Sequence, residues 1–236
     1  MSHSFLANVQ AEHVGSASSV LFFISHPVKI ESEPKMKVFH SLNHLITRQP
    51  TAVTIGNFDG LHLGHQKVLH SMLQAAKTAG NDSVVITFFP HPKAYANKDG
   101  FFYLTSMDEK LKLLARMGID RVVVLEFGRE LMRVRAAEFI NLLVSNLTLR
   151  DLWIGHDFWF GYQREGDVAL LRHMGDILGY TVNAAAPVLL SGRPISSSRI
   201  RDALRAGDWA QASACLGYPY HETIAPIGVE PFFAKQ

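Results

Sequence analysis

The sequence predicts an α/β fold in which a parallel sheet carries helices on both of its faces. Two observations predict this class. Short runs of apolar, mostly β-branched residues recur along the chain, and amphipathic helical segments separate them. The runs are largely apolar on both faces, as expected of strands that helices cover from each side. The alternation begins near Met36, without internal repeats or low-complexity segments.

Five segments are expected to form the strands. Four are compact and rich in valine and isoleucine, and the fifth is looser. In chain order they cover residues 51–55, 83–89, 121–127, 151–155 and 181–190.

Helical segments lie between these strands. The first has one apolar face and ends at Gly80 and Asn81, a typical helix stop. That face consists of Val68, Leu69, Met72, Leu73 and Ala76. A second helix is expected over 106–118, where Ser106 and Glu109 have the spacing of a capping box. The remaining helices are expected over 136–147 and 165–179, and after the serines at 196–198.

Composition is that of an ordinary globular protein. Of the 236 residues 47% are hydrophobic and 19% are charged, enough for a core without stapling. The net charge of +2 is too weak to indicate nucleic acid, but it suits a small anionic substrate. The single cysteine, Cys215, excludes an internal disulfide and a cysteine-rich zinc site.

No segment resembles a membrane span or a secretory signal. The apolar run VLFFI at 20–24 is too short to span a bilayer and lacks the flanks of a signal peptide. We therefore expect a cytoplasmic protein with no membrane or nucleic-acid partner. Residues 1–35 are mixed in composition and are expected to form a flexible extension before a domain over 36–218.

The stretch TIGNFDGLHLGHQ at 54–66 lies between the first strand and the first helix. In open α/β sheets ligands bind at this position, and a helix N-terminus attracts anions. Its glycines allow a tight turn, and His62 and His65 are spaced to donate hydrogen bonds to phosphate oxygens. A metal site and a purely structural turn remain open, although no third ligand is near; a Walker A loop is excluded.

A second motif lies late in the chain. RPISSSRIRDALRAGDW at 193–209 places three serines before a helical pattern, where Ser196 to Ser198 would supply an N-cap and hydroxyl groups. Arg199 and Arg201 fall in the first turn, where positive charge opposes the helix dipole. An anionic ligand would explain this placement, and a capped surface helix with solvated arginines is the alternative.

Taken together, four ordered motifs resemble one known family. They are GNFDGLHLGHQ, TFFPHP at 87–92, IGHDFWFG at 154–161 and ISSSRIR at 195–201. They are similar to the adenylyltransferase part of bifunctional riboflavin kinase/FMN adenylyltransferase, a branch of the nucleotidylyltransferase superfamily. The resemblance covers 36–218 and implies a Rossmann-like nucleotidylyltransferase fold.

The resemblance also implies a reaction. FMN and ATP would be the substrates, FAD and pyrophosphate the products, and Mg²⁺ would bridge the phosphates. His62, His65 and Arg201 would be the catalytic residues, with Arg201 on the phosphates that leave as pyrophosphate. The resemblance implies a nucleotide site made of Gly56, Asn57, Phe58, Asp59, Gly64, Asp157, Ser196, Ser197 and Ser198.

Aromatic residues after two of the strands are candidates for the flavin pocket. The candidates are Phe89, His91, Phe158 and Phe160. Flat rings stack well on adenine or isoalloxazine, but alternate aromatics in such a segment commonly fill the core. His91 follows a strand between two prolines, and it either lines the pocket or is exposed there.

This sequence departs from the family pattern at several points. Phe89 stands where the family usually has an acidic residue, and Ser198 replaces a threonine. No riboflavin kinase motif follows Tyr218, and residues 219–236 are too short for that domain. We therefore expect adenylyltransferase without kinase activity, with a separate riboflavin kinase in the pathway. A nucleotidylyltransferase for another phosphorylated substrate and a non-catalytic flavin- or nucleotide-binding paralogue are the alternatives.

Overall fold

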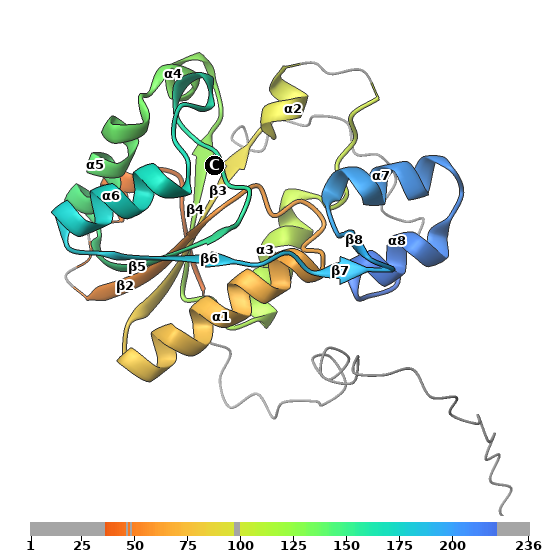
Figure 1. The fold of residues 1–236 in the computed structure, drawn as a ribbon, viewed down its shortest axis with the longest axis horizontal. Helices are drawn as coiled ribbons and strands as arrows, with labels where there is room; N and C mark the ends of the chain where they lie inside the picture. Colours follow the sequence, from red (N-terminus) through yellow and green to blue (C-terminus); the bar gives the residue numbers. More distant parts are fainter. Residues whose placement is uncertain (1–35, 46, 48, 97–99, 221–236) are drawn as a thin grey trace, which may run out of the picture. The chain divides into compact units, whose positions relative to one another are not determined.

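The computed structural model of the protein describes residues 36–45, 47, 49–96 and 100–220 (Figure 1). The expected extension at 1–35 and nearly all of the expected C-terminal tail lie outside these residues, so both expectations stay predictions. Within the described part of the chain, no helix is both long and apolar enough to cross a membrane.

A parallel sheet of six strands forms the centre of the fold, as the sequence predicts. Its strand order is β1-β4-β3-β2-β5-β6, and every neighbouring pair is parallel. The strands are β1 (Lys37–Phe39), β2 (Pro50–Ile55), β3 (Asp82–Phe89), β4 (Arg121–Glu126), β5 (Thr148–Gly155) and β6 (Thr181–Ala185). The order reverses direction beside β2, so the loop after β2 lies where α/β sheets bind ligands.

Helices cover both faces of the sheet (Figure 1). On one face lie α1 (Leu63–Ala79) and α3 (Met107–Arg116), and on the other α5 (Ala136–Asn146) and α6 (Val168–Leu178). Alternate strand residues supply the two cores: Val53 faces α5, while its neighbour Ala52 faces α1 and α3. The doubly covered sheet is therefore confirmed.

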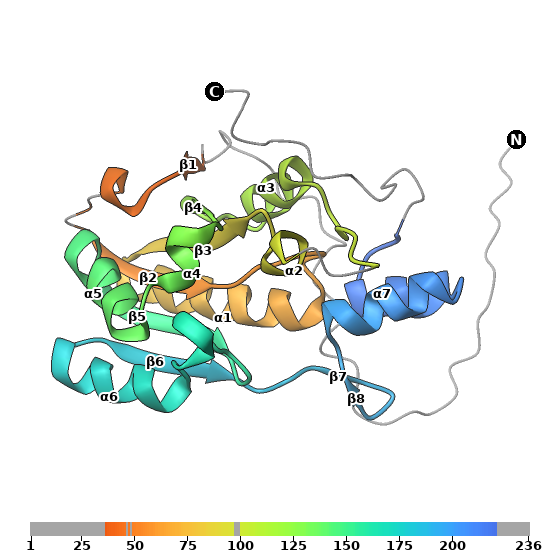
Figure 2. The same cartoon turned by 90° about the horizontal axis from the view of Figure 1, so that it is seen from above.

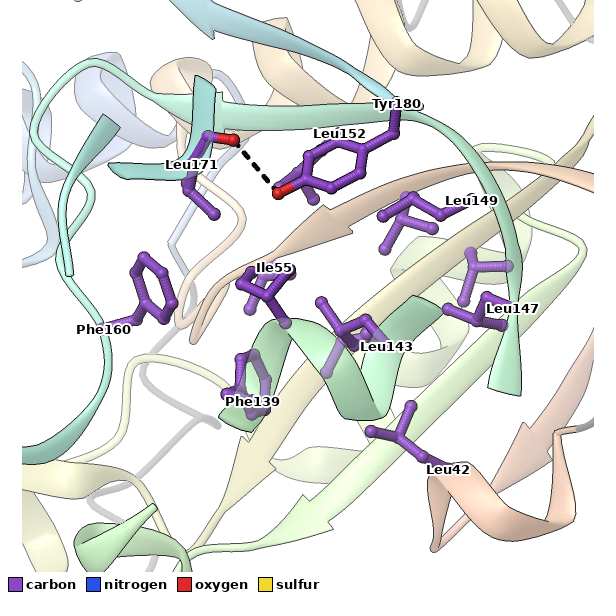
Figure 3. Packing of buried hydrophobic residues seen from close by; sticks show 14 of the residues in the cluster. Leu42, Ile55, Phe139, Leu143, Leu147, Leu149, Leu152, Phe160, Leu171 and Tyr180 are labelled. Atoms are coloured by element: carbon purple, nitrogen blue, oxygen red, sulfur yellow. Dashed lines mark hydrogen bonds between the residues drawn. The ribbon is translucent and has the colours of Figure 1, made fainter. Parts of the chain in front are cut away.

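The core between α5, α6 and the sheet is shown in Figure 3. Ile55 and Leu152 of the strands pack there with Phe139 and Leu143 of α5. The Tyr180 ring is buried among them, and its hydroxyl donates a 3.0 Å hydrogen bond to a carbonyl oxygen of α6. That bond satisfies a polar atom that would otherwise be costly to bury.

The predicted helix ends are confirmed where they rest on capping chemistry. Ser106 and Glu109 form the capping box of α3, with the Glu109 N–H 3.1 Å from the Ser106 hydroxyl. Helix α1 ends at Gly80 in the left-handed conformation, at φ 68°. The predicted helix at 165–179 begins later, because Asp167 accepts a 2.8 Å bond from the Leu170 N–H and caps it.

Two predicted segments differ from the structure at their ends. The looser strand at 181–190 ends at Ala185, and Pro187, which cannot donate to a ladder, precedes β7 (Leu189–Leu190). The helix predicted after the serines is α7 (Ser197–Arg205), and a second helix that the sequence analysis did not predict, α8 (Trp209–Leu216), follows it through Gly207 at φ 71°. The sequence analysis missed the short elements β1, η1 (Leu42–His44), α2 (Pro92–Tyr95), α4 (Arg129–Arg133), η2 (Tyr162–Arg164) and β8 (Arg193–Pro194).

Figure 2 shows α7 beyond the carboxyl ends of the strands, beside the start of α1. The strand pair β7 and β8 is antiparallel and leads the chain into α7. Helices α7 and α8 share a small core with Leu104 and Ile195. The late motif therefore lies at the carboxyl end of the sheet, where the loop after β2 also lies.

Candidate active site

The two motifs meet at the carboxyl end of the sheet. The loop 56–62 leaves β2 and leads into α1, while Ser197 is the first residue of α7. The Ser197 hydroxyl donates a 2.9 Å hydrogen bond to the main-chain oxygen of Asp59, 138 positions earlier in the chain. Two helix N-termini, whose free backbone N–H groups attract anions, therefore lie close to the same loop.

Asp59 and Arg201 form a buried ion pair between the motifs. Asp59 is 1% exposed and Arg201 3%, and their carboxylate and guanidinium groups are in direct contact. Asp59 also accepts bonds of 3.0 and 3.2 Å from the Leu104 and Thr105 N–H groups. Arg201 donates a 2.8 Å bond from Nε to the Phe102 carbonyl. The pair thus joins the loop after β2 to α7 and to the segment before α3.

Opposing effects act on the ionisation of Asp59. Burial raises the pKa of its carboxyl, while Arg201 and Lys110 lower it. Burial also lowers the pKa of Arg201, and Asp59 opposes that effect. Each charge is therefore tolerated because the other is present, and either one alone would be an unpaired buried ion.

The placement of Arg199 and Arg201 does not need an anionic ligand, contrary to the interpretation from sequence. Arg201 is paired with Asp59. Arg199 donates from Nη1 to the carbonyl oxygens of Leu190 at 3.0 Å and Arg193 at 2.8 Å, on β7 and β8. Both arginines bind acceptors inside the protein, which the sequence alone does not reveal.

His62 and His65 lie stacked at the start of α1. Their ring centroids are 3.6 Å apart with an angle of 16° between the planes. His62 is the N-cap of the helix, and its Nδ1 atom accepts a bond of 3.3 Å from the His65 N–H. Because Nδ1 is the acceptor, the neutral His62 ring carries its proton on Nε2, where it can serve as a donor.

Both histidines are held neutral. Burial lowers the pKa of His62 to about 4 and, together with His62, Lys110 and His91, holds the pKa of His65 well below its usual value. The exposed carboxylate of Asp157 raises the pKa of His62 and so opposes part of the shift there. The Nδ1 atom of His65 is buried and has no hydrogen-bond partner within the part of the chain that the structure describes.

The three serines of the late motif have different partners. Ser196 is the predicted N-cap of α7 and accepts a 3.2 Å bond from the Arg199 N–H. Ser197 binds the Asp59 carbonyl, as above. The Ser198 hydroxyl accepts a 3.1 Å bond from Nζ of Lys93. The sequence analysis did not single out Lys93, although it directly follows the TFFPHP motif.

Two glycines, Gly60 in the loop and Gly64 in the first turn of α1, leave little room for a side chain. A Cβ atom at Gly60, where φ is 80°, would lie 2.9 Å from the Leu104 side chain. At Gly64 it would lie 3.1 Å from Cε1 of His62, so this glycine keeps the space for the imidazole. Phe58, at φ 48°, is buried, and its ring centroid lies 5.3 Å from that of His65 in an edge-on arrangement. Gly56 lies against the same Phe58 ring.

Lys110 is a site residue that the sequence analysis missed. It is 3% exposed on α3, and its Nζ donates a 2.8 Å hydrogen bond to the main-chain oxygen of Asn57. The available signal was its place on the apolar face of the helix, between Met107 and Leu114. A lysine in that stripe is unusual unless a polar partner awaits it.

Phe89 and His91 lie among aromatic rings at the end of β3. Phe89 is buried, with its ring centroid 6.0 Å from that of Tyr103. His91 is also buried, 4.8 Å from the Phe101 ring, so of the two alternatives for this residue the exposed one is excluded. Burial lowers the pKa of His91 to about 3, with a contribution from nearby Arg201. Both residues lie against residues 101–103, in the segment before α3 that is hydrogen-bonded to Asp59 and Arg201.

The loop after β5 separates its aromatic residues into two environments. Phe160 is buried in the core against Phe139 at 6.2 Å, which favours the core-filling alternative for this candidate flavin contact. Phe158 is partly buried and stacks on Phe160 at 5.6 Å. Trp159 is 49% exposed. Of these rings, Trp159 is therefore the one most available to a ligand.

The end of α8 supports the loop after β2. Gln66 donates from Nε2 to the carbonyl oxygens of Leu61 and Leu216, both at 2.8 Å. The Tyr218 hydroxyl donates a 2.7 Å bond to the Gly60 carbonyl. Residues at the end of the described chain are thus bonded to the loop that carries His62.

The residues do not form a protein cage for a metal ion. Over 36–45, 47, 49–96 and 100–220, no group of three or more histidine, cysteine, aspartate or glutamate side chains is placed to hold one. A separate hollow of about 490 Å³ lies beside α7 and α8; it includes Ser196 and Ser198 but not His62 or His65.

Comparisons with known proteins identify a family and relatives that this chain resembles. Residues 44–199 match the FAD synthetase family. The chain is 38% identical over 168 residues to the bifunctional riboflavin kinase/FMN adenylyltransferase of Pseudomonas fluorescens, covering 71% of this chain and 54% of that one. It is 39% identical over 185 residues to a putative protein of the same name from Geobacillus thermodenitrificans, covering 78% and 98% respectively.

The chain therefore spans about half of the Pseudomonas relative but nearly all of the Geobacillus one. Among solved structures, the crystal structure of a macrolide-efflux protein from Streptococcus pneumoniae has a similar fold. Its TM-score is 0.70 at 26% sequence identity, and the match covers 78% of this chain and 60% of that one.

Proposed function

The chain belongs to the FAD synthetase family, and from this we propose that it transfers the adenylyl group of ATP to FMN. The products would be FAD and pyrophosphate. The observation that carries the proposal is that the two motifs lie together, joined by the hydrogen bond from the Ser197 hydroxyl to the Asp59 carbonyl. It places the histidine pair and the start of α7 around one loop, as a site for a triphosphate requires.

In the proposed reaction a phosphate oxygen of FMN attacks the α-phosphorus of ATP in line. A new phosphorus–oxygen bond forms, the bond from the α-phosphorus to the bridging oxygen breaks, and pyrophosphate leaves with the electron pair. No covalent intermediate on the protein is needed, so catalysis would consist of positioning and charge stabilisation.

His62 and His65 would act as neutral hydrogen-bond donors to the reacting phosphate. The proton on Nε2 of His62 follows from the bond at its Nδ1, and the burial that keeps the ring neutral removes competing water. Loop 56–59 and Gly64 would shape the nucleotide pocket. Ser198 and Arg201 would hold the departing phosphates together with the main-chain N–H of Ser197, whose hydroxyl proton is committed to Asp59. Arg201 keeps N–H donors beyond those that bind Asp59 and Phe102.

A magnesium ion would fit this site as a partner of the phosphates. Mg²⁺ keeps few protein ligands and is bound largely through substrate phosphates and water. Asp59 is committed to Arg201, whereas the exposed carboxylate of Asp157 acts on His62 and is the protein group that would help to hold the ion. When bound, the ion would neutralise charge on the pyrophosphate.

FMN is itself a phosphorylated product, so a riboflavin kinase is the expected source of the second substrate, in the cytoplasm. The direct test incubates the purified chain with ATP, Mg²⁺ and FMN, with riboflavin, 4′-phosphopantetheine and nicotinamide mononucleotide in parallel. The flavins are then separated by chromatography and pyrophosphate is measured. FAD from FMN alone supports the proposal. Adenylylation of another substrate, or bound FMN without pyrophosphate release, would contradict it.

A further inference from the structure

Lys110 is a buried cation that lies against the loop after β2. It shares the inner face of α3 with Met107 and Leu114 and is 3% exposed. Burial lowers the pKa of its ammonium group to about 8, with Asp59 opposing the shift. A charge in such a place must be compensated by polar contacts inside the protein.

The ammonium group binds the main chain of the loop. Its Nζ atom donates a 2.8 Å hydrogen bond to the Asn57 carbonyl and lies 3.5 Å from the Thr87 hydroxyl. The Thr87 hydroxyl donates to the same carbonyl at 3.1 Å. Two donors from different elements, α3 and β3, therefore fix the orientation of the peptide that follows Asn57.

That peptide leads into a stretch of unfavourable backbone conformation. Phe58 has φ 48° and Leu61 has φ 34°, values that residues with side chains rarely adopt. Such conformations persist only where the surroundings determine them. The bond from Lys110 is one such determinant, at the point where the loop leaves the sheet and before His62 begins the helix.

Lys110 also gives the buried part of the site a surplus positive charge. Within the part of the chain that the structure describes, the buried charged side chains are Asp59, Lys110 and Arg201. Asp59 and Arg201 neutralise each other, and the buried histidines are held neutral. One positive charge remains beside the loop, which suits an anionic ligand.

We propose that Lys110 is a positioning residue for the nucleotide, an inference that rests on the proposed function. It holds the Asn57 carbonyl and so the loop whose N–H groups and following histidines receive the triphosphate of ATP. It acts through Asn57, without touching the reacting atoms. Replacing Lys110 with methionine would remove the bond to Asn57 and displace the loop. The core beside α3 would stay intact, because a methionine side chain fills about the same space.

The test compares Lys110→Met with Lys112→Met, which alters an exposed lysine of the same helix. ATP dissociation constants are measured by calorimetry, together with KM, kcat and thermal melting. For K110M we expect weaker ATP binding and a fall in kcat/KM for ATP of about 100-fold, the cost of a displacement of about 1 Å. Its melting temperature should equal or exceed that of the unaltered protein, because an apolar residue replaces a buried charge. K112M should match the unaltered protein throughout.

Unchanged ATP affinity in K110M would overturn the proposal. If the melting temperature also fell, Lys110 would be a merely structural residue. If K110M does not fold, Thr87→Val decides: it removes the other donor to the Asn57 carbonyl and should weaken ATP binding in the same direction. ATP binding without any FAD formation in the unaltered protein would refute the proposed function, while the dissociation constants still decide the role of Lys110.

Discussion

The hydroxyl of Ser197 donates a hydrogen bond to the carbonyl oxygen of Asp59, joining two segments that lie 138 positions apart. The acceptor is main chain, so the bond fixes the course of the loop while the Asp59 carboxylate remains with Arg201. This contact holds the start of α7 at the histidine loop.

Replacing Ser197 with alanine should therefore reduce activity more than stability. We expect a loss of about 1 kcal/mol in the free energy of unfolding, typical of one hydrogen bond, and a larger proportional fall in kcat/KM. Thr78→Ala is the control, because Thr78 also donates to a carbonyl, at 2.8 Å, on an exposed face of α1. Urea unfolding and steady-state kinetics would show both; equal activity in S197A and T78A would contradict the prediction.

Replacing His65 with alanine should remove most turnover while the fold survives. Loss of one donor to a developing charge typically costs about 100-fold or more in kcat. His173, exposed on α6, provides the matched control in H173A. FAD formation and circular dichroism would be measured together. Full activity in a folded H65A protein would remove His65 from the mechanism.

The stability of the protein should fall as the pH drops from about 6.5 to about 4. His62 has a folded-state pKa of about 4, below its value in the unfolded chain, so the unfolded state binds more protons in this interval. The full effect of this one group is about 3 kcal/mol. His62→Asn keeps an N-cap but cannot titrate. Urea unfolding across this interval should show a shallower loss for H62N; parallel curves would contradict the assignment.

The Asp59–Arg201 pair should be far more sensitive to mutation than an exposed pair. Asp59→Asn leaves Arg201 buried without a counter-charge, and we expect a loss of about 3–5 kcal/mol. Asp202→Asn breaks the exposed contact of 2.8 Å with Arg205 and should cost about 0–1 kcal/mol. Urea unfolding at pH 7 measures both. Similar losses in the two variants would show that the buried pair is not a structural link.

Alanine substitutions at Phe160 and Trp159 should have opposite effects on stability and on the KM for FMN. Phe160→Ala removes a core ring and should cost about 3–5 kcal/mol, with little effect on the KM for FMN of the remaining folded protein. Trp159→Ala should leave stability nearly unchanged, and if this exposed ring meets the flavin it should raise the KM for FMN. A stable F160A protein would contradict the placement of Phe160 in the core.

Much of this fold could be predicted because its signals are local. Apolar runs and capping residues such as Ser106 and Gly80 indicate a strand or a helix end from only a few neighbouring positions. Strands as short as β1 depend on tertiary pairing and left too little pattern to detect, whereas the division of 181–190 had a local signal, the proline at 187, that the prediction of one strand passed over.

The site could be predicted only as a set of motifs. The partners that matter come from elsewhere in the chain: Asp59 for Arg201, the β7 and β8 carbonyls for Arg199, and Lys110 for Asn57. Reading Arg199 and Arg201 against the helix dipole suggested a ligand, because distant acceptors have no trace in the local sequence. The histidine pKa values likewise follow from burial, which spacing does not report.

The bonds from Gln66 and Tyr218 to the loop after β2 bear on how a smaller working fragment could be cut from this chain. The family signature ends at residue 199, inside α7, whereas the contacts that brace the loop extend to Tyr218. A fragment trimmed to the signature would lose most of α7, all of α8, the bond from Tyr218 to Gly60 and the bond from Gln66 to Leu216. The shortest useful design must therefore keep the chain through Tyr218, because the contacts that support the loop extend beyond the family signature.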